Sequence, residues 1–425
     1  MKQGTEEKNN KKVWVFNQFA VSPDMPGGTR HYDLFKELSR YGFDIMIFAS
    51  DYNLFKRRFL KLKGYEFSKK EAYGRVTFKW IRVISYKENN FRRVLNVLSY
   101  SFNSFFSALN ESSVDYVIGS SPHIFILLSS YLIAKFKKAK YIVELRDLWP
   151  QSGIDLGEIN KNGIIARVMF FIENFSVKRA SKVIVLSNGS KDYLINKKCP
   201  EYKIVFIPNG VSKEHFSSKK LNIQQYNRDS DKEFKIIYAG AFSEANSLET
   251  IVEAALVLQG KNINVNFTLL GDGPKRKYLE NLCYKKGIIN VHFKDPISHS
   301  EILSFISTFD VGILTLKKAK VFRYAISPNK VFDYMATSIP VICAVRGEIG
   351  NLVEKSGSGI VIDEEDPSKL AEAILFVYNI GSEERKGMGI RGRRFVMKHF
   401  LRENLALVLR DGLMNISPSR EIHQD

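Results

Sequence analysis

Short apolar runs alternate with helix-periodic segments along most of the chain. The first two runs are 13–16 and 45–49, and the segment 29–41 between them has apolar positions at helical spacing. The same order of strand, helix and strand returns within 116–207 and again within 235–378. Strands that alternate with helices predict parallel sheets in doubly wound α/β domains. The sequence therefore predicts two tandem Rossmann-like domains with a ligand site in the cleft between them.

Breaks in this rhythm suggest where the domains begin and end. A Pro-Asn-Gly turn at 208–210 closes the first series, and the polar stretch 212–235 is typical of an interdomain linker. We therefore predict an N-terminal domain at 1–211 and a C-terminal domain at 212–390. A helical tail at 391–425 can pack back on the N-terminal domain.

The segment 51–110 interrupts the α/β pattern of the first domain. Its part 56–70 is basic and carries aromatic residues, and from Phe91 to Leu109 apolar side chains recur at helical spacing. We expect this apolar stripe to pack in the core. The basic stretch 56–70 is the better candidate for an interfacial contact with a membrane.

The distribution of charge supports a phosphate-rich partner. The chain has a net charge of +19, and residues 1–210 hold 34 Lys and Arg against 19 Asp and Glu. A surface this basic attracts the phosphates of nucleic acid or of anionic lipid. The alternative is an ordinary solvated basic face.

Composition excludes several classes of protein. With 44% hydrophobic and 26% charged residues, the chain is expected to fold rather than to be disordered. Cys199, Cys283 and Cys343 lie far apart, which indicates a reducing compartment and neither a disulfide framework nor a zinc site. The polar start, 1–12, predicts no signal peptide, and the apolar run 124–134 is too short to span a membrane.

Polar residues follow several of the predicted strands. Gly27 and Gly28 lie after the first strand, and His123, Arg146 and Asp147 follow two later ones. In open α/β sheets such strand ends line the ligand crevice. The glycines let a backbone approach a ligand, but they lack the spacing of a dinucleotide site. His123 fits a sugar contact or a partly buried position equally well, and Asp147 fits a salt bridge with Arg146.

The stretch from Arg323 to Ala344 changes from a loop into a helix and then into a buried strand. Ser327 is a natural N-cap for this helix. A loop that leads into a helix N-terminus leaves backbone N–H groups free to bind an anion, and Lys330 and Asp333 lie in the first turns. The pattern predicts a phosphate-bearing ligand here, with an ordinary capped helix as the alternative.

Five short motifs follow one another along the chain. They are Gly27-Gly28-Thr29-Arg30, Arg146-Asp147-Leu148-Trp149-Pro150, Ile207-Pro208-Asn209-Gly210-Val211, Gly271-Asp272-Gly273-Pro274, and Ser327-Pro328-Asn329-Lys330 with Phe332-Asp333-Tyr334-Met335-Ala336. In this order they resemble the motifs of GT-B glycosyltransferases of family 4, specifically the subgroup that builds bacterial O-antigen and capsule sugars. The resemblance covers nearly the whole chain.

The resemblance implies a GT-B fold whose C-terminal domain binds a nucleotide-sugar, commonly a UDP-sugar, and whose N-terminal domain binds the acceptor. It implies a retaining, metal-independent glycosyltransferase without a cofactor. The expected donor-binding residues are Gly27, Gly28, Arg323, Ser327, Asn329, Lys330 and Asp333. The expected acceptor-side residues are Arg30, Arg146 and Trp149. Lys330 is expected to be catalytic, and Asp147 and His123 are expected to contact the acceptor or the sugar.

Two positions depart from the family pattern. Of two glutamates eight positions apart, Asp333 takes the place of the second and Ala325 that of the first. The Arg and Lys that many relatives carry after the first strand of the second domain are absent from 240–246. We therefore expect Lys330, aided by helix N–H groups and by Arg323, to neutralise the diphosphate.

The expected partners are a polyprenyl-diphosphate-linked sugar and an anionic membrane surface, on the inner face of the cytoplasmic membrane. Nucleic acid is not expected as a partner, and the sequence does not define the oligomeric state. Two alternatives stay open. One is a nucleotide-sugar 2-epimerase of the same two-lobed fold, and the other is a non-catalytic protein that binds a membrane or nucleic acid through its basic patch.

Overall fold

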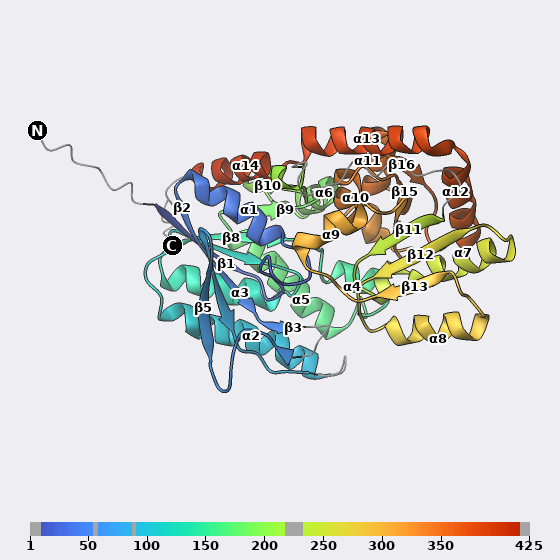
Figure 1. Cartoon of the computed structure of the whole chain (residues 1–425). Coiled ribbons are helices and arrows are strands. Elements are labelled where there is room, and N and C mark those ends of the chain that lie inside the picture. The colour runs from blue at the N-terminus through green and yellow to red at the C-terminus, as the bar shows by residue number, and fades with distance from the viewer. Residues whose placement is uncertain (1–9, 54–57, 87–90, 217–232, 417–425) are drawn as a thin grey trace, which may run out of the picture.

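The computed structural model describes residues 10–53, 58–86, 91–216 and 233–416. They form two α/β domains built on largely parallel sheets, which confirms the predicted fold class (Figure 1). Most of the predicted linker 212–235 lies outside the described residues. No described helix has the length and the apolar composition needed to cross a bilayer.

The N-terminal domain is built on an eight-stranded sheet in the order β10-β9-β8-β7-β1-β2-β6-β5. All neighbours are parallel except β5 and β6. Its central strands are continuous apolar runs because helices cover both faces. The strands are β1 (Lys11–Phe16), β2 (Phe43–Ser50), β5 (Ser68–Tyr73), β6 (Val76–Ile81), β7 (Tyr116–Ser120), β8 (Lys140–Leu145), β9 (Lys182–Val185) and β10 (Ile204–Phe206), and a separate antiparallel pair is β3 (Tyr52–Asn53) and β4 (Arg58–Phe59).

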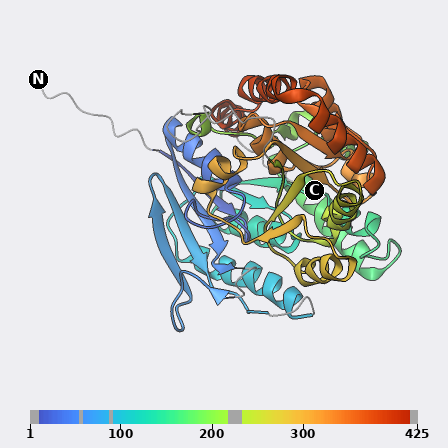
Figure 2. The same ribbon diagram turned by 45° about the vertical axis from the view of Figure 1, so that its right-hand side comes forward.

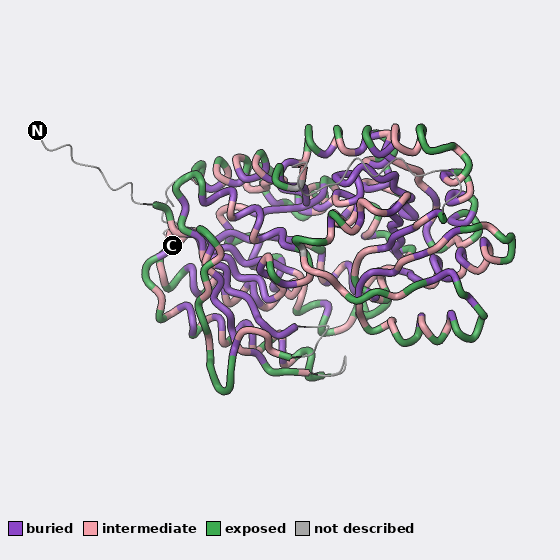
Figure 3. Tube along the Cα trace, viewed as in Figure 1, coloured by how far each residue is buried: buried purple, intermediate pink, exposed green. Residues whose placement is uncertain are grey.

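Helices α2, α3 and α5 pack on one face of this sheet, and α1 packs on the other (Figure 1). The buried strands lie between these layers (Figure 3). The helices of the N-terminal domain are α1 (Arg30–Leu38), α2 (Phe91–Leu109), α3 (Phe125–Phe136), α4 (Gln151–Asp155), α5 (Ile164–Arg179) and α6 (Asn188–Asn196).

The C-terminal domain has a six-stranded, all-parallel sheet in the order β13-β12-β11-β14-β15-β16. Helices α7, α8 and α12 cover one face, and α9, α10 and α11 cover the other. The strands are β11 (Phe234–Ala239), β12 (Val265–Leu270), β13 (Val291–Lys294), β14 (Val311–Thr315), β15 (Val341–Ala344) and β16 (Gly359–Val361). The helices are α7 (Leu248–Gly260), α8 (Arg276–Lys286), α9 (His299–Ile306), α10 (Asn329–Ala336), α11 (Glu348–Ser356) and α12 (Pro367–Asn379).

The last two helices join the domains along one edge of the molecule (Figure 2). Helix α13 (Gly381–His399) packs against α10, and α14 (Arg402–Met414) returns to the N-terminal domain, where it packs against α1. At the turn between them, Val211 donates to the carbonyl of Phe400 at 2.9 Å and accepts from the N–H of Arg402 at 2.8 Å. A Cβ at Gly210 would lie 2.2 Å from the Phe400 carbonyl oxygen, so only glycine allows this approach.

Helix α2 contradicts the expectation that its apolar stripe packs in the core. The buried side is lined by Asn96, Tyr100 and small residues such as Ser104, whereas the apolar side faces solvent. Polar contacts hold the helix in this orientation, because Asn96 donates to the carbonyl of Ile84 at 2.6 Å and the Tyr100 hydroxyl donates to the carbonyl of Phe48 at 2.6 Å. Helical spacing identifies an apolar face but does not say whether a neighbouring element covers it.

Candidate functional site

A cavity of about 560 Å³ lies between the two domains at the carboxyl ends of their strands. This volume is typical of small-molecule sites. The N-terminal domain contributes the Gly27-Gly28 loop and Arg146, and the C-terminal domain contributes Gly240 and the start of α10. Seven of the sequence-predicted residues line it, namely Gly27, Gly28, Arg146, Ser327, Asn329, Lys330 and Asp333.

The loop before α10 is fixed by the other domain. The Ser327 hydroxyl accepts from the backbone N–H of Asn209 at 3.0 Å, and the Asn209 side-chain amide donates to the Ser327 carbonyl. The sequence suggested Ser327 as the N-cap of α10, and this prediction is wrong. The helix begins at Asn329 after Pro328, which gives no side-chain cap. The first N–H groups of a helix have no partner within it, so the cavity-lining start of α10 can donate to an anion.

Lys330 is the half-buried cation of this site. Its ammonium donates to the Tyr238 hydroxyl at 2.9 Å and to Asn246 Oδ1 at 3.3 Å, and it lies 4.0 Å from the centre of the Tyr238 ring. Among the described residues, no carboxylate lies within ion-pair distance of it. Burial lowers the pKa of Lys330 to about 7. A bound anion would supply the counter-charge that the protein does not.

Two more polar groups at the cavity have no partner among the described residues. They are Asn329 Oδ1 and Arg146 Nε, and both atoms are buried. Asn329 also touches the other domain, because a Cβ at Gly28 would lie 2.8 Å from its Nδ2. Buried polar groups in native proteins are nearly always hydrogen-bonded, so these two atoms indicate a place for a polar ligand.

Asp333 lies one turn further along α10 and is half-buried. Burial raises the pKa of its carboxyl to about 7, with a smaller opposing effect from Arg402 and a reinforcing one from Asp33. Arg402, at the start of α14, lines the same cavity and forms an ion pair with Asp33. The tail thus contributes directly to the site.

Sequence reasoning missed Arg402, Tyr238 and Asn246. Arg402 lies in a tail without a motif, 72 positions after Lys330 in the numbering. Tyr238 is near the end of a buried strand, where an aromatic residue is more typical of the core. Asn246 lies just where the expected basic residues are absent, and it contacts the ammonium of Lys330 instead.

Several predicted residues lie outside this cavity. Arg323 forms an ion pair with Glu364 at 3.2 Å. His123 packs edge-on against Tyr100, neither of its ring nitrogens has a hydrogen-bond partner among the described residues, and burial lowers its pKa to about 3. Asp147 is exposed at the end of β8. Trp149 packs against Gly153, where a Cβ would lie 2.6 Å from its ring.

Arg30, which was expected on the acceptor side, is buried in a network beneath the cavity. Its guanidinium binds Glu144 Oε1 at 3.0 and 3.1 Å and donates to the carbonyls of Ile207 and Pro208, each at 2.7 Å. Glu144 Oε2 binds His31 Nε2 at 2.7 Å. Burial alone would raise the pKa of Glu144, but His31 and Arg30 outweigh it and hold that pKa well below its usual range.

Comparison with known proteins agrees with this geometry. The family model "Glycosyl transferase 4-like domain" matches residues 27–210, and "Glycosyl transferases group 1" matches residues 219–395. Together they span most of the chain. The two models, one on each domain, indicate a GT-B glycosyltransferase of the family 4-like type.

Individual relatives are distant. The chain is 22% identical over 294 residues to the putative colanic acid biosynthesis glycosyl transferase WcaI of Escherichia coli K12, covering 67% of this chain and 71% of that protein. It is 21% identical over 301 residues to the probable glycosyltransferase WbjE of Pseudomonas aeruginosa, and the match covers 68% of this chain and 73% of that protein.

Solved structures share the fold. A sucrose-phosphate synthase from Thermosynechococcus elongatus superposes with a TM-score of 0.71 at 16% identity, covering 95% of this chain and 98% of that one. The Anabaena protein HepE, solved in complex with UDP-glucose, superposes with a TM-score of 0.65 at 14% identity, covering 95% and 99%.

The change Glu144→Gln removes the charge that Arg30 faces. We expect the free energy of unfolding at neutral pH, measured by urea denaturation, to fall by about 3–5 kcal/mol, because a buried guanidinium is left unpaired. The folded-state pKa of Glu144 lies below its unfolded value of about 4.3, so its charge stabilises the fold above that pH. This contribution is lost as the pH falls through the folded-state pKa. The free energies of unfolding of wild type and variant should therefore become more similar in acid.

The matched control is Glu383→Gln, which removes an exposed partner of Lys386. Its effect should stay below about 1 kcal/mol. A similarly small effect of Glu144→Gln would show that the buried pair does not stabilise the fold.

Proposed function

We propose that this protein transfers a glycosyl group, with retention of configuration, from a UDP-sugar to a lipid-linked saccharide during synthesis of a bacterial surface polysaccharide. The observation that carries the proposal is the ammonium of Lys330, half-buried in the interdomain cavity without a carboxylate partner among the described residues. The name of WcaI, a putative colanic acid biosynthesis glycosyl transferase, favours polysaccharide synthesis, and the UDP-glucose complex of HepE favours a UDP-sugar donor.

The proposed donor pose follows from the unpartnered groups of the cavity. The diphosphate would lie against the start of α10, where Lys330 and the first N–H groups neutralise it. Arg146 would reach it from the N-terminal domain. Asp333 would accept hydrogen bonds from ribose hydroxyls, the role that the family resemblance gives its position.

In the proposed reaction, the bond between the anomeric carbon and the β-phosphate oxygen breaks, and a bond to an acceptor hydroxyl oxygen forms on the same face. Negative charge grows on the leaving phosphate. Lys330 stabilises that charge in a site from which much of the water is excluded, where such an interaction is strongest. The departing phosphate becomes more basic and accepts the hydroxyl proton. No metal is needed in this scheme.

The proposed acceptor is a polyprenyl-diphosphate-linked sugar on the inner face of the cytoplasmic membrane. A screen of UDP-sugars for UDP release, with and without such acceptors, identifies the pair. UDP release that needs an acceptor supports transfer. Conversion of a UDP-sugar without any acceptor would indicate the epimerase, and no binding of UDP at millimolar concentration would indicate a non-catalytic protein.

Lys330→Ala should lower kcat/KM by about 30- to 1000-fold, equivalent to about 2–4 kcal/mol of transition-state stabilisation. UDP release with the donor found in the screen measures this. The control is Lys275→Ala, because Lys275 belongs to the same domain but pairs with Glu249 at 2.8 Å and does not line the cavity. It should leave turnover nearly unchanged. Near-normal turnover of Lys330→Ala would show that the phosphates are held elsewhere.

Nucleotide-sugar binding should take up a proton above pH 7. Free Lys330 has a pKa of about 7, and a bound diphosphate raises that pKa, so the lysine is largely neutral before binding and charged after it. Affinity should therefore fall as the pH rises from 7 to 8.5. Calorimetry in buffers of different ionisation enthalpy measures the uptake, with a UDP-sugar as ligand because its phosphates do not titrate in this range.

Two variants assign this proton. Lys330→Gln keeps a polar side chain that cannot titrate, so the uptake should disappear. Asp333→Asn tests the other group with a pKa of about 7. Uptake that persists in Lys330→Gln and vanishes in Asp333→Asn would contradict the assignment to Lys330.

A further inference from the structure

Helices α2, α3 and α5 lie side by side on the side of the N-terminal sheet opposite to α1 and α14 (Figure 1). The outward side of α2 is apolar. Its exposed large side chains are Phe91, Val94, Leu98, Phe102 and Phe106. They recur every three or four residues, so they form one stripe along the whole helix. Phe102 is 64% exposed although it lies in the middle of the helix.

The neighbouring helices continue this apolar surface. Phe136 on α3 is 66% exposed, and Phe171 on α5 is 67% exposed. Leu132 on α3 and Ile164 and Ile165 at the start of α5 are exposed as well. Exposed apolar side chains that gather on packed neighbouring helices are typical of surfaces that contact a protein or a membrane. We call this surface the α2–α3–α5 face.

The charges on the same helices select between these partners. The cations of the three helices are Arg92, Arg93, Lys135, Arg167, Lys178 and Arg179. Their single acidic residue, Glu173, is buried and pairs with Lys197 at 2.9 Å. The exposed side is therefore apolar and positive. Two copies of it would bring like charges together, whereas an anionic lipid surface complements both properties.

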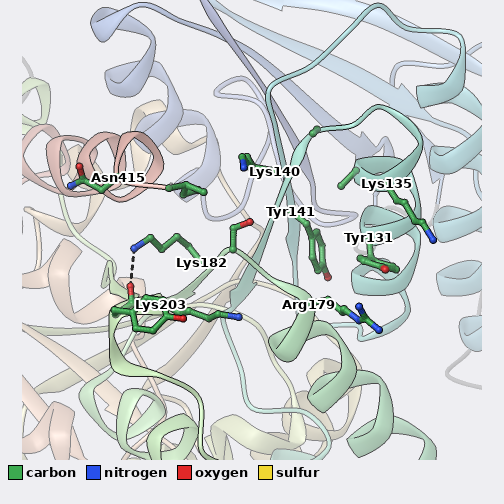
Figure 4. A pocket seen from close by; sticks show the side chains of 13 residues that line it. Tyr131, Lys135, Lys140, Tyr141, Arg179, Lys182, Lys203 and Asn415 are labelled. Carbon is green, nitrogen blue, oxygen red and sulfur yellow. Dashed lines mark hydrogen bonds between the residues drawn. The ribbon is translucent and has the colours of Figure 1, made fainter. Parts of the chain in front are cut away.

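A basic cavity of about 650 Å³ opens at the C-terminal ends of α3 and α5 (Figure 4). Its cationic lining residues are Lys135, Lys140, Arg179, Lys182 and Lys203, and no lining residue is acidic. Lys182 and Lys203 donate to backbone carbonyls, of Tyr202 at 2.7 Å and of Lys178 at 3.1 Å. Among the described residues, no carboxylate lies within ion-pair distance of Lys135 or Arg179. The cavity has the charge to hold a phosphate headgroup at the edge of the apolar face.

We propose that the α2–α3–α5 face docks the protein on an anionic bilayer, with its aromatic side chains in the interfacial region and the cations at the ends of α3 and α5 against lipid phosphates. This differs from the membrane contact expected at 56–70. In that stretch, Lys61 pairs with Asp24 at 2.7 Å and Lys70 pairs with Glu111 at 2.8 Å, so part of its charge is neutralised. The proposal stands apart from the transfer reaction, because docking needs no nucleotide-sugar.

Co-sedimentation of the full chain with vesicles tests the apolar part. The vesicles are phosphatidylcholine with and without phosphatidylglycerol, and they contain no acceptor lipid. The triple variant Phe102→Ser, Phe136→Ser, Phe171→Ser should bind the anionic vesicles about tenfold or more weakly than wild type. The control replaces two exposed apolar residues of the C-terminal domain, Tyr284→Ser with Ile289→Ser, and should bind as wild type does. Wild-type binding by the triple variant overturns the proposal.

The electrostatic part has its own matched pair of variants. Arg167→Glu with Arg179→Glu should weaken binding to anionic vesicles about tenfold or more. Lys277→Glu with Lys285→Glu changes the net charge by the same amount on exposed positions of α8, and should weaken binding much less. Equal losses in both pairs would show that only the net charge matters and would overturn the assignment to this face.

A tryptophan reporter locates the contact without loss of apolar surface. Phe102→Trp fluorescence should be quenched by brominated lipids beyond the background of Trp14, Trp80 and Trp149, whereas Tyr284→Trp should not be. Unchanged circular dichroism and thermal midpoints show that each variant is folded. If the wild type forms dimers that the serine triple variant abolishes, while vesicle binding is unaffected, the face is a protein interface and the proposal is wrong.

Discussion

The buried ion pair between Arg30 and Glu144 fixes the geometry on which the site depends. Glu144 lies near the end of β8, an inner strand of the N-terminal sheet, and Arg30 begins α1. The same guanidinium holds the carbonyls of Ile207 and Pro208, where the chain leaves this domain. The next residue, Asn209, donates hydrogen bonds to Ser327 in the loop before α10. One continuous set of hydrogen bonds therefore runs from the core of one domain to the loop before α10 of the other, and it ties together the two sides of the interdomain cavity.

The side chains of Arg30 and Lys330 have different environments, since Arg30 is buried and Lys330 is half-buried. The guanidinium of Arg30 donates its hydrogen bonds to a carboxylate and to backbone carbonyls. It therefore stabilises the fold and has few donors free for a ligand. Among the residues that the structure describes, the ammonium of Lys330 binds only a phenol and an amide oxygen, and Arg146 Nε has no partner. Such incomplete pairing costs stability in the free protein. The proposed diphosphate would complete this pairing, so the cations that stabilise the fold least are the ones best suited to such a ligand.

The sequence predicted the tandem α/β architecture because apolar strands and helices alternate with clear periods. It also identified Lys330 from a loop-to-helix signal and Gly28 from a glycine signal, while the motif resemblance added Asn329, and the structure brings the three together. Contacts between distant segments left no such signal. Arg402 reaches the cavity only because α14 folds back, and Arg30 lies in a motif yet is buried beneath the cavity. The exposed stripe of α2 was misjudged for the same reason, since periodicity defines a face but not its neighbour.

The two proposed phosphate contacts, in the interdomain cavity and on the α2–α3–α5 face, differ in their access to water. In the interdomain cavity, Lys330 is half-buried and acts over hydrogen-bonding distance, so salt screens it little. On the α2–α3–α5 face, cations such as Arg167 and Arg179 are exposed, and their attraction for a surface falls steeply within a Debye length of about 8–10 Å. Ionic strength should therefore weaken the proposed membrane binding strongly and the proposed binding of the nucleotide-sugar only weakly. Such a separation would let a strongly basic chain combine the proposed donor site with the proposed affinity for anionic surfaces.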